Sequence, residues 1–403
     1  MQPHLRAGDG RPSFGAVLIG TFVIMLDTGA VYVVAPSVRH DLGADRATAG
    51  WLVMGYSVAY ALLLGPGERL GRRFGRETVL LASLGGFAAA SALCGTAGSP
   101  HALVGWRVLQ GATAGVMNPQ ILGLLSVASR DRGPVTALVV YQVTSGVTVA
   151  LGPLLAGALI AWDPAGAGWR AVFLVNVPVV AVLFLAVAAG RRRVRSWPVP
   201  PCGDRASHAA VRDRRTVIGA ALDFWHFGAV AAVWYVVASR LRWDEGQSAL
   251  VAGSWLLPLS AASVLAFVAI GCSPARGSGR RALWAGAGLT AAGVTGAAAV
   301  LADGGATGGG ATGWVLVPSL LAVGAGSGLL SAAVADLVLA CRSWREATRA
   351  DRMLNVSQRL GAVGGVAVAA LAPVGLGAYG ALGLVVPVLL LAAMVPDVHR
   401  PRP

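Results

Sequence analysis

The sequence predicts an all-α polytopic membrane protein with twelve transmembrane helices in two bundles of six. Of its 403 residues, 56% are apolar and only 12% are charged, and the mean hydropathy is +0.68. A soluble domain carries about 25% charged residues, so this chain has too little polar surface to cover a water-soluble body. Its apolar residues gather in stretches that reach the roughly 20 residues a spanning helix needs. A soluble enzyme, a coiled coil and a disordered chain are excluded.

Twelve apolar stretches follow one another, separated by polar joints. They cannot be strands of a membrane barrel, which would alternate in hydropathy over about 10 residues. Several exceed 20 residues, so tilted helices are expected. The stretches are 14–38, 48–66, 78–97, 102–129, 134–161, 170–190, 216–239, 247–271, 282–302, 313–340, 354–374 and 377–396.

The arginines indicate the orientation of these helices. The formal net charge is +14, and all 32 basic residues are Arg. Of these, 25 lie in the N-terminus, the even-numbered joints and the C-terminal tail, while five lie in the odd-numbered joints. Because Lys and Arg are enriched in cytoplasmic loops, residues 1–13 and 397–403 are expected in the cytoplasm. The positive net charge is therefore explained by the orientation of the helices in the membrane, and no nucleic-acid partner is expected.

A polar joint at 191–215 divides the chain. It carries eight Arg and two Asp around a Pro-rich run, a composition typical of a flexible linker. It separates 14–190 from 216–396, two halves of nearly equal length with six apolar stretches each. This division predicts a duplicated transporter with a cytoplasmic linker. The Gly-rich joint at 303–313 is expected on the outside.

Sites for metals, nucleotides and enzymatic chemistry are not indicated. A phosphate-binding loop needs Lys, which the chain lacks. We therefore expect no cofactor, no metal and no enzymatic activity, and we expect an ion gradient to supply the energy. A cleavable signal peptide is not expected, because the first apolar run is long and contains Asp27. The four cysteines lack metal or redox spacing and should be free thiols, namely Cys94, Cys202, Cys272 and Cys341.

Five motifs occur in order in the first half, and together they resemble those of the major facilitator superfamily. The joint at 67–76 resembles the signature loop of that superfamily, and the run from Arg107 resembles its helix 4 motif. A Gly–Pro run resembles its antiporter motif. The segments around Asp27 and Trp169-Arg170 resemble the EmrB/QacA type of drug:proton antiporter. The residues of these segments are Asp27, Glu68, Arg69, Arg72, Arg73, Gly75, Arg76, Arg107, Gln110, Gly111, Gly146, Gly152, Pro153, Gly157, Asn176 and Pro178, of which Glu68 and Arg72 differ from the usual pattern.

The resemblance continues into the second half at Ser248–Gly253, Leu257-Pro258, and Asn355, Gln358 and Gly361. It covers nearly the whole chain except 191–215 and 303–313. It implies the major facilitator fold in a twelve-helix form, in which the halves rock to alternate access. It also implies a monomer in the cell membrane that exports a small organic molecule or drug in exchange for protons. An importer or facilitator of the same fold, and a non-transporting sensor or decayed paralogue, stay open.

Charged residues inside the apolar stretches are candidates for coupling, because an ionisable group at bilayer depth by default marks a functional site. At 1.5 Å per residue, Asp27 and Arg107 reach similar depths on their helices. A carboxylate whose surroundings alternate between an apolar pocket and a guanidinium would bind and release a proton. Asp27 is therefore the predicted proton or cation site, with Arg107 as its electrostatic partner. The alternative is that Asp27 only fixes its helix by hydrogen bonding.

Other polar residues are candidates for the substrate cavity or an inner gate. Asp223 and His226 share a helix face and would either line the cavity as a pair or extend to water at the helix end. Asp336 and Arg359 would form an inner-gate pair or, preferably, lie at solvated helix ends. Each aromatic candidate could instead serve only in packing. The full set of cavity candidates is Tyr32, Tyr56, Gln110, Tyr141, Gln142, Asp223, Trp225, His226, Asn355 and Gln358.

The signature loop departs from the pattern that it resembles. Its usual Asp is Arg72, and the position before Arg69 is Glu68. In the superfamily that Asp is thought to latch the two halves near the start of helix 11. Here that start reads Ala350-Asp351-Arg352, so we expect Arg72 to pair with Asp351 in a latch of reversed polarity. The alternative is that Asp351 merely caps its helix. The helix 1 motif also departs, with Gly29 and Tyr32 where Thr and Asn are usual.

Overall fold

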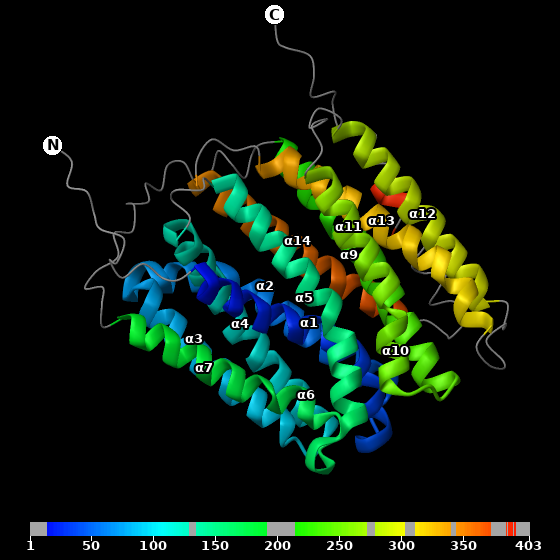
Figure 1. Cartoon of the computed structure of the whole chain (residues 1–403), viewed down its shortest axis with the longest axis horizontal. Coiled ribbons are helices and arrows are strands. Elements are labelled where there is room, and N and C mark those ends of the chain that lie inside the picture. Colours follow the sequence, from blue (N-terminus) through cyan, green and yellow to red (C-terminus); the bar gives the residue numbers. More distant parts are fainter. Residues whose placement is uncertain are drawn as a thin grey trace, which may run out of the picture.

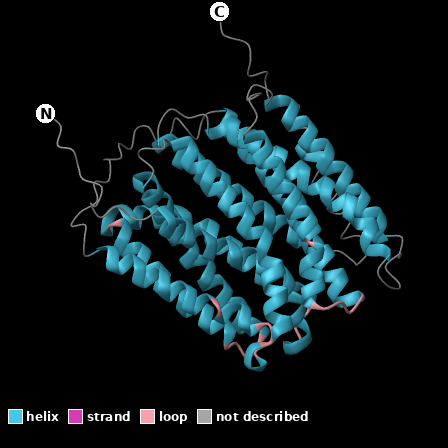
Figure 2. Ribbon diagram, in the orientation of Figure 1, coloured by secondary structure: helices cyan, strands magenta, loops and turns pink. Residues whose placement is uncertain are grey.

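The computed structural model describes residues 14–128, 134–191, 214–271, 279–302, 311–339, 344–371, 384, 386–389 and 391. The regular structure in this part of the chain is entirely helical (Figure 2). Ten stretches within it are long and apolar enough to cross a membrane. The ten do not include α4 (Pro100–Ala128), which carries Arg107 and several amides. Most of the twelfth predicted stretch lies outside the described residues, as do Cys202, Cys272 and Cys341; Cys94 is a buried free thiol.

The first half contains six long helices, the last of them in two pieces. A short turn, η1 (Pro164–Gly166), precedes the sixth. The helices are α1 (Phe14–Leu42), α2 (Arg46–Phe74), α3 (Arg76–Gly95), α4, α5 (Pro134–Trp162), and α6 (Arg170–Leu174) continued by α7 (Asn176–Arg191).

The second half has the same plan as far as it is described. A π-helical turn, η3 (Arg240–Asp244), extends its first helix. The helices are α9 (Arg214–Ser239), α10 (Ala249–Trp255) continued by α11 (Leu257–Gly271), α12 (Gly279–Ala302), α13 (Ala311–Leu339) and α14 (Trp344–Leu371).

Prolines explain why the sixth and eighth helices are broken. Proline has no backbone N–H, so it leaves the carbonyl four residues before it without a helical donor. Pro178 follows the break at Val175 between α6 and α7. Pro258 follows the equivalent break at Leu256 between α10 and α11.

The two halves pack side by side, with their contact through a few central helices. Within the first half, α2 packs on α4 and α1 on α5, while α12 packs on α13 and α14 on α9 in the second. Contacts between the halves are made by α2 with α14 and by α5 with α10 and α11. In Figure 1 the central helices lie between α3 and α7 at one edge and α12 at the other.

Glycines allow the closest of these helix pairs to touch through their backbones. A Cβ on Gly111 of α4 would lie 2.7 Å from Tyr56 Cα of α2, and one on Gly115 would lie 3.0 Å from Tyr60 Cα. In the second half, Gly361 and Gly365 bring α14 onto the backbone of α9 in the same way. Small residues favour such close approach in lipid, where the hydrophobic effect does not hold helices together.

The segment expected as a basic loop at 67–76 is mostly helix. Residues 67–74 are the last two turns of α2, and Gly75 alone separates α2 from α3. Gly75 has a φ of +88°, a conformation that favours glycine and lets the chain reverse direction in one residue. Arg76 then donates from Nη1 to the carbonyl of Pro119 at 2.8 Å, which ties this corner to α4.

The packing predicts that Gly111→Ala destabilises the protein. The added methyl meets the backbone of Tyr56, and overpacking of this kind costs about 1–3 kcal/mol. Gly105→Ala on the same helix is the matched control, because nothing lies within 4 Å of its Cβ position. Thermal unfolding in detergent should show a lower Tm for the first variant and an unchanged or higher Tm for the second. Equal values would contradict the close packing of α2 on α4.

Candidate functional site

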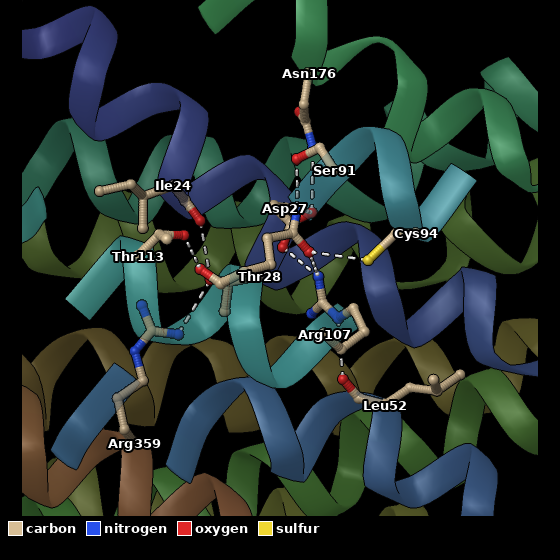
Figure 3. A network of polar contacts seen from close by, with 11 residues as sticks. Ile24, Asp27, Thr28, Leu52, Ser91, Cys94, Arg107, Thr113, Asn176 and Arg359 are labelled. Carbon is tan, nitrogen blue, oxygen red and sulfur yellow. Dashed lines mark hydrogen bonds and ion pairs between the residues drawn. The ribbon is translucent and has the colours of Figure 1, made fainter. Parts of the chain in front are cut away.

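A buried ion pair lies inside the first half, between α1 and α4. Arg107 Nη1 donates to Asp27 Oδ2 at 2.5 Å, and both side chains are at most 2% exposed. Two amides complete the contacts of the carboxylate: Gln110 Nε2 at 3.1 Å and Asn176 Nδ2 at 3.2 Å, both to Oδ1 (Figure 3). The charge of Asp27 is thus compensated by one cation and two neutral donors.

The same network holds the guanidinium in place. Arg107 also donates to Gln110 Oε1 at 2.7 Å and from Nε to the Leu52 carbonyl at 3.1 Å (Figure 3). Its Cζ lies 4.5 Å from the ring centroid of Tyr56, a cation–π contact. These contacts join α1, α2, α4 and α7, so the pair also fixes the core of the first half. Sequence reasoning placed Asp27 and Arg107 at similar depth, and the structure brings them together.

A cavity of about 230 Å³ lies between the two halves. Its wall includes Thr28, one residue beyond Asp27, but neither member of the ion pair. The wall combines aromatic side chains, amides, one carboxylate and one guanidinium. Of the predicted cavity residues, Tyr32, Tyr141, Gln142, Asp223, Asn355 and Gln358 line it, together with Gly146 of the antiporter motif.

Four predicted cavity residues do not line this cavity. Tyr56 and Gln110 belong to the network around Arg107. His226 is buried but faces α13, where its Nε2 lies 2.9 Å from Ser327 Oγ, so it does not form the proposed pair with Asp223. Trp225 packs edge-on against Phe224. Helical spacing correctly put Asp223 and His226 on one side of α9, but their side chains diverge to different neighbours.

Two buried carboxylates of the second half are bound by amides. Asp223 accepts a hydrogen bond from Gln358 Nε2 at 2.9 Å. Asp351 accepts from Asn355 Nδ2 at 2.9 Å and, across the boundary between the halves, from Gln142 Nε2 at 3.0 Å. Neither carboxylate forms a salt bridge with the described residues. Asp27 is therefore one of three deeply buried acids among the described residues.

Arg359 lies in the cavity wall, not at a helix end. It is 8% exposed, and its Nη1 donates to Thr28 Oγ1 of the opposite half at 3.1 Å (Figure 3). Its Nη2 lies 3.4 Å from Met25 Sδ, and its Cζ lies 4.4 Å from the Tyr60 ring centroid. Asp336 is exposed and is not its partner. The depth was misjudged because α14 begins at Trp344, ten residues before the apolar stretch.

The predicted pairing of Arg72 with Asp351 is not formed. Asp351 is fully buried more than one turn inside α14, so it is neither the partner of Arg72 nor a cap. Arg72 instead contacts Glu68 on its own helix at 3.5 Å. Glu68 also forms an ion pair with Arg352 of α14, which joins the two halves. The departure at Glu68, rather than Arg72, supplies the anion of this latch.

The remaining signature residues lie at this same corner of the molecule. Arg69 is exposed, Arg73 lies with its Cζ 5.2 Å from the Phe74 ring centroid, and Arg76 binds the Pro119 carbonyl described above. The halves also touch at the opposite end, where α1 joins α2. There Arg242 Nη2 donates to Ser37 Oγ at 2.7 Å, and Arg39 Cζ lies 4.7 Å from the Trp243 ring centroid. Contacts between the halves therefore occur at both ends of the cavity.

The glycines of the antiporter motif bring α5 close to its neighbours. A Cβ on Gly152 would lie 2.8 Å from Ala30 N of α1, and one on Gly157 would lie 2.8 Å from Leu250 Cα of α10. Gly253 of α10 approaches Pro153 in return. Gly146 differs, because a Cβ there would make only an ordinary contact with Val264. This motif thus forms part of the boundary between the halves.

Comparisons with known proteins agree on the family. Residues 17–365 match the family described as Major Facilitator Superfamily. The "Probable actinorhodin transporter" of Streptomyces coelicolor is 30% identical over 88% of this chain and 71% of its own length. The "Multidrug export protein EmrB" of Haemophilus influenzae is 34% identical, but the match spans 41% of this chain and 31% of that protein. The nucleoside transporter NupG has the same fold, with a TM-score of 0.68 over 94% of this chain and 98% of its own, at 12% identity.

The geometry predicts that Glu68 and Arg352 are energetically coupled, whereas Arg72 and Asp351 are not. Glu68→Gln and Arg352→Gln should each loosen the latch, and the double variant should do no more than either one. The pair is partly buried and partly screened by solvent, so its contribution is on the order of 1 kcal/mol. The matched cycle uses Arg72→Gln and Asp351→Asn. The effect of this double variant should equal the sum of the effects of its two single variants.

Both cycles are read from the rate at which a maleimide labels a cysteine introduced at position 146 in the cavity wall, in protein otherwise free of cysteine. Loosening the latch should raise this rate. Additivity at 68 and 352, or coupling at 72 and 351, would contradict the observed pairing.

Proposed function

Because the chain belongs to the Major Facilitator Superfamily, we propose that it exports a small organic molecule in exchange for protons. Export is supported by relatives whose names include the word export, such as the "Multidrug export protein EmrB", and transport by the "Probable actinorhodin transporter". The observation that carries the proposal is a cavity between two halves with a buried carboxylate–guanidinium pair directly behind its wall. In this proposal a proton gradient supplies the energy for export.

Alternating access would use the contacts at the two ends of the cavity in turn. The Glu68–Arg352 latch would open toward the cytoplasm, and the contacts around Ser37 and Trp243 would open outward. The arginine distribution supports this orientation, in which both termini of a cell-membrane protein would lie in the cytoplasm. One chain suffices as the working unit, because both halves of the same chain line the cavity.

Asp27 is the proposed proton site. Protonation would remove its charge and weaken its bond to Arg107, while the two amides could still hold the neutral carboxyl group. Thr28 follows Asp27 in α1 and accepts a hydrogen bond from Arg359 of the other half. A shift of α1 on protonation would therefore move Thr28 and alter its hydrogen bond with Arg359 in the other half. This contact links the proton site to the relative position of the halves.

A second candidate for the proton site is Asp223. In contrast to Asp27, it lines the cavity directly and has an amide rather than a cation as its partner. A carboxylate without a cation is costly to keep ionised inside a membrane protein. A substrate that enters the cavity could compete directly with a proton at this residue.

The proposed function predicts proton-driven uptake into inverted membrane vesicles. The probe is the neutral dye N-phenyl-1-naphthylamine, followed by its fluorescence after a proton gradient is imposed. Vesicles with the protein should accumulate the dye faster than vesicles without it, and collapse of the gradient should stop this uptake. Uptake that needs no gradient would favour a facilitator, and binding without uptake would favour a sensor.

Asp27→Asn should abolish the gradient dependence while leaving the protein folded and able to bind the probe. The amide keeps the shape of the side chain but cannot carry a proton. Asp223→Asn is the matched variant and should retain gradient-driven uptake, with at most a few-fold change in probe affinity. If Asp27→Asn keeps gradient-driven uptake and Asp223→Asn loses it, the proton site is Asp223 and not Asp27.

A further inference from the structure

Arg359 is the cation of the cavity, and its charge is not neutralised by the described protein. It lies in the wall with 8% of its surface exposed. Its three recorded contacts are the Thr28 hydroxyl, the Met25 thioether and the face of Tyr60. All three partners are neutral, and no carboxylate in the described parts of the chain forms an ion pair with it.

The contrast with Arg107 shows what is unusual about this residue. Arg107 is also buried, but it is paired with Asp27 at 2.5 Å. A guanidinium stays charged under all conditions, so Arg359 cannot relieve its burial by losing a proton. Charges inside a membrane protein are normally paired or face a substrate pathway. Arg359 lies in the wall of the cavity and forms no ion pair with the described residues.

The rest of the cavity wall favours an aromatic or otherwise apolar molecule. Tyr32 and Trp234 meet edge-on with ring centroids 5.2 Å apart, and Phe227 lies nearby in the wall. The one carboxylate of the described wall, Asp223, accepts a hydrogen bond from Gln358, whereas Asp351, which does not line the cavity, accepts from Asn355 and Gln142. Arg359 is therefore the one cation that the described wall offers to an acidic ligand.

We propose that Arg359 is the specificity residue of the cavity and that the substrate is an amphipathic organic anion. Its acidic group, a carboxylate, sulfonate or phenolate, pairs with the guanidinium in place of the neutral contacts to Thr28 and Met25. Its apolar body lies against Tyr32, Trp234 and Phe227. This inference rests on the proposed transport function and deepens it by naming the class of substrate.

Binding to the purified protein tests this inference separately from transport. The probes are 8-anilino-1-naphthalenesulfonate and N-phenyl-1-naphthylamine, which share an aromatic framework and differ by one sulfonate. Dissociation constants are measured by equilibrium dialysis in a nonionic detergent free of anionic lipid. Wild-type protein should bind the sulfonate at least tenfold more tightly than the neutral probe. Equal affinities would overturn the proposal, even if vesicles show export of the neutral dye.

Variants assign the preference to Arg359. Arg359→Gln should lose at least tenfold in affinity for the sulfonate and change little for the neutral probe, whereas Arg359→Lys should keep part of the preference. Arg214→Gln is the matched control, because it removes the same charge from the exposed start of α9. A loss of both probes in Arg359→Gln, or an unchanged sulfonate affinity, would overturn the assignment. If Arg359→Gln does not fold, the ratio of the dissociation constants for the two probes is compared between Arg359→Lys and the wild type. A ratio close to one in both proteins would overturn the assignment.

Discussion

The ion pair between Asp27 and Arg107 is the interaction on which the first half of the molecule depends. It places two opposite charges in a core where each alone would be very costly, and it holds them with amides from α4 and α7. Loss of one partner of such a pair leaves an uncompensated buried charge, which is strongly destabilising. It therefore fixes α1 against α4 while keeping a protonatable group one residue from the cavity wall. In the proposed transport cycle, the same contact both stabilises the first half and couples transport to protons.

The second half handles its buried charges differently. Asp223, Asp351 and Arg359 are all at least 90% buried, yet amides, a hydroxyl, a thioether and an aromatic face are their partners. The two halves thus have similar helix plans but unequal electrostatics: the first is compensated internally, and the second presents charge toward the cavity. We interpret the first half as the coupling unit and the second as the unit that recognises substrate. Contacts such as Arg359 to Thr28 connect the two roles.

The sequence was sufficient to predict an all-α membrane protein, because long apolar stretches are local signals, and the ordered motifs indicated the family. It also predicted that Asp27 and Arg107 lie at similar depth, since helix rise converts position into height. It failed at Arg359 and Asp351 because the first turns of α14 are polar, so hydropathy hid the true start of the helix at Trp344. It also missed the pairing of Glu68 with Arg352, and of Gln142 with Asp351. Contacts across more than 200 residues depend on how the halves pack, which no local pattern encodes.

The most direct test of the central claim is the thermal stability of the protein when the ion pair is removed in parts and as a whole. Asp27→Leu or Arg107→Met alone leaves a buried charge without its partner, which typically costs about 3–5 kcal/mol. The double variant leaves neither charge. If the pair organises the first half as described, each single variant unfolds at a clearly lower temperature and the double variant recovers more than half of the larger loss. A double variant whose loss equals the sum of the two single losses would show that Asp27 and Arg107 act independently, and would contradict the account.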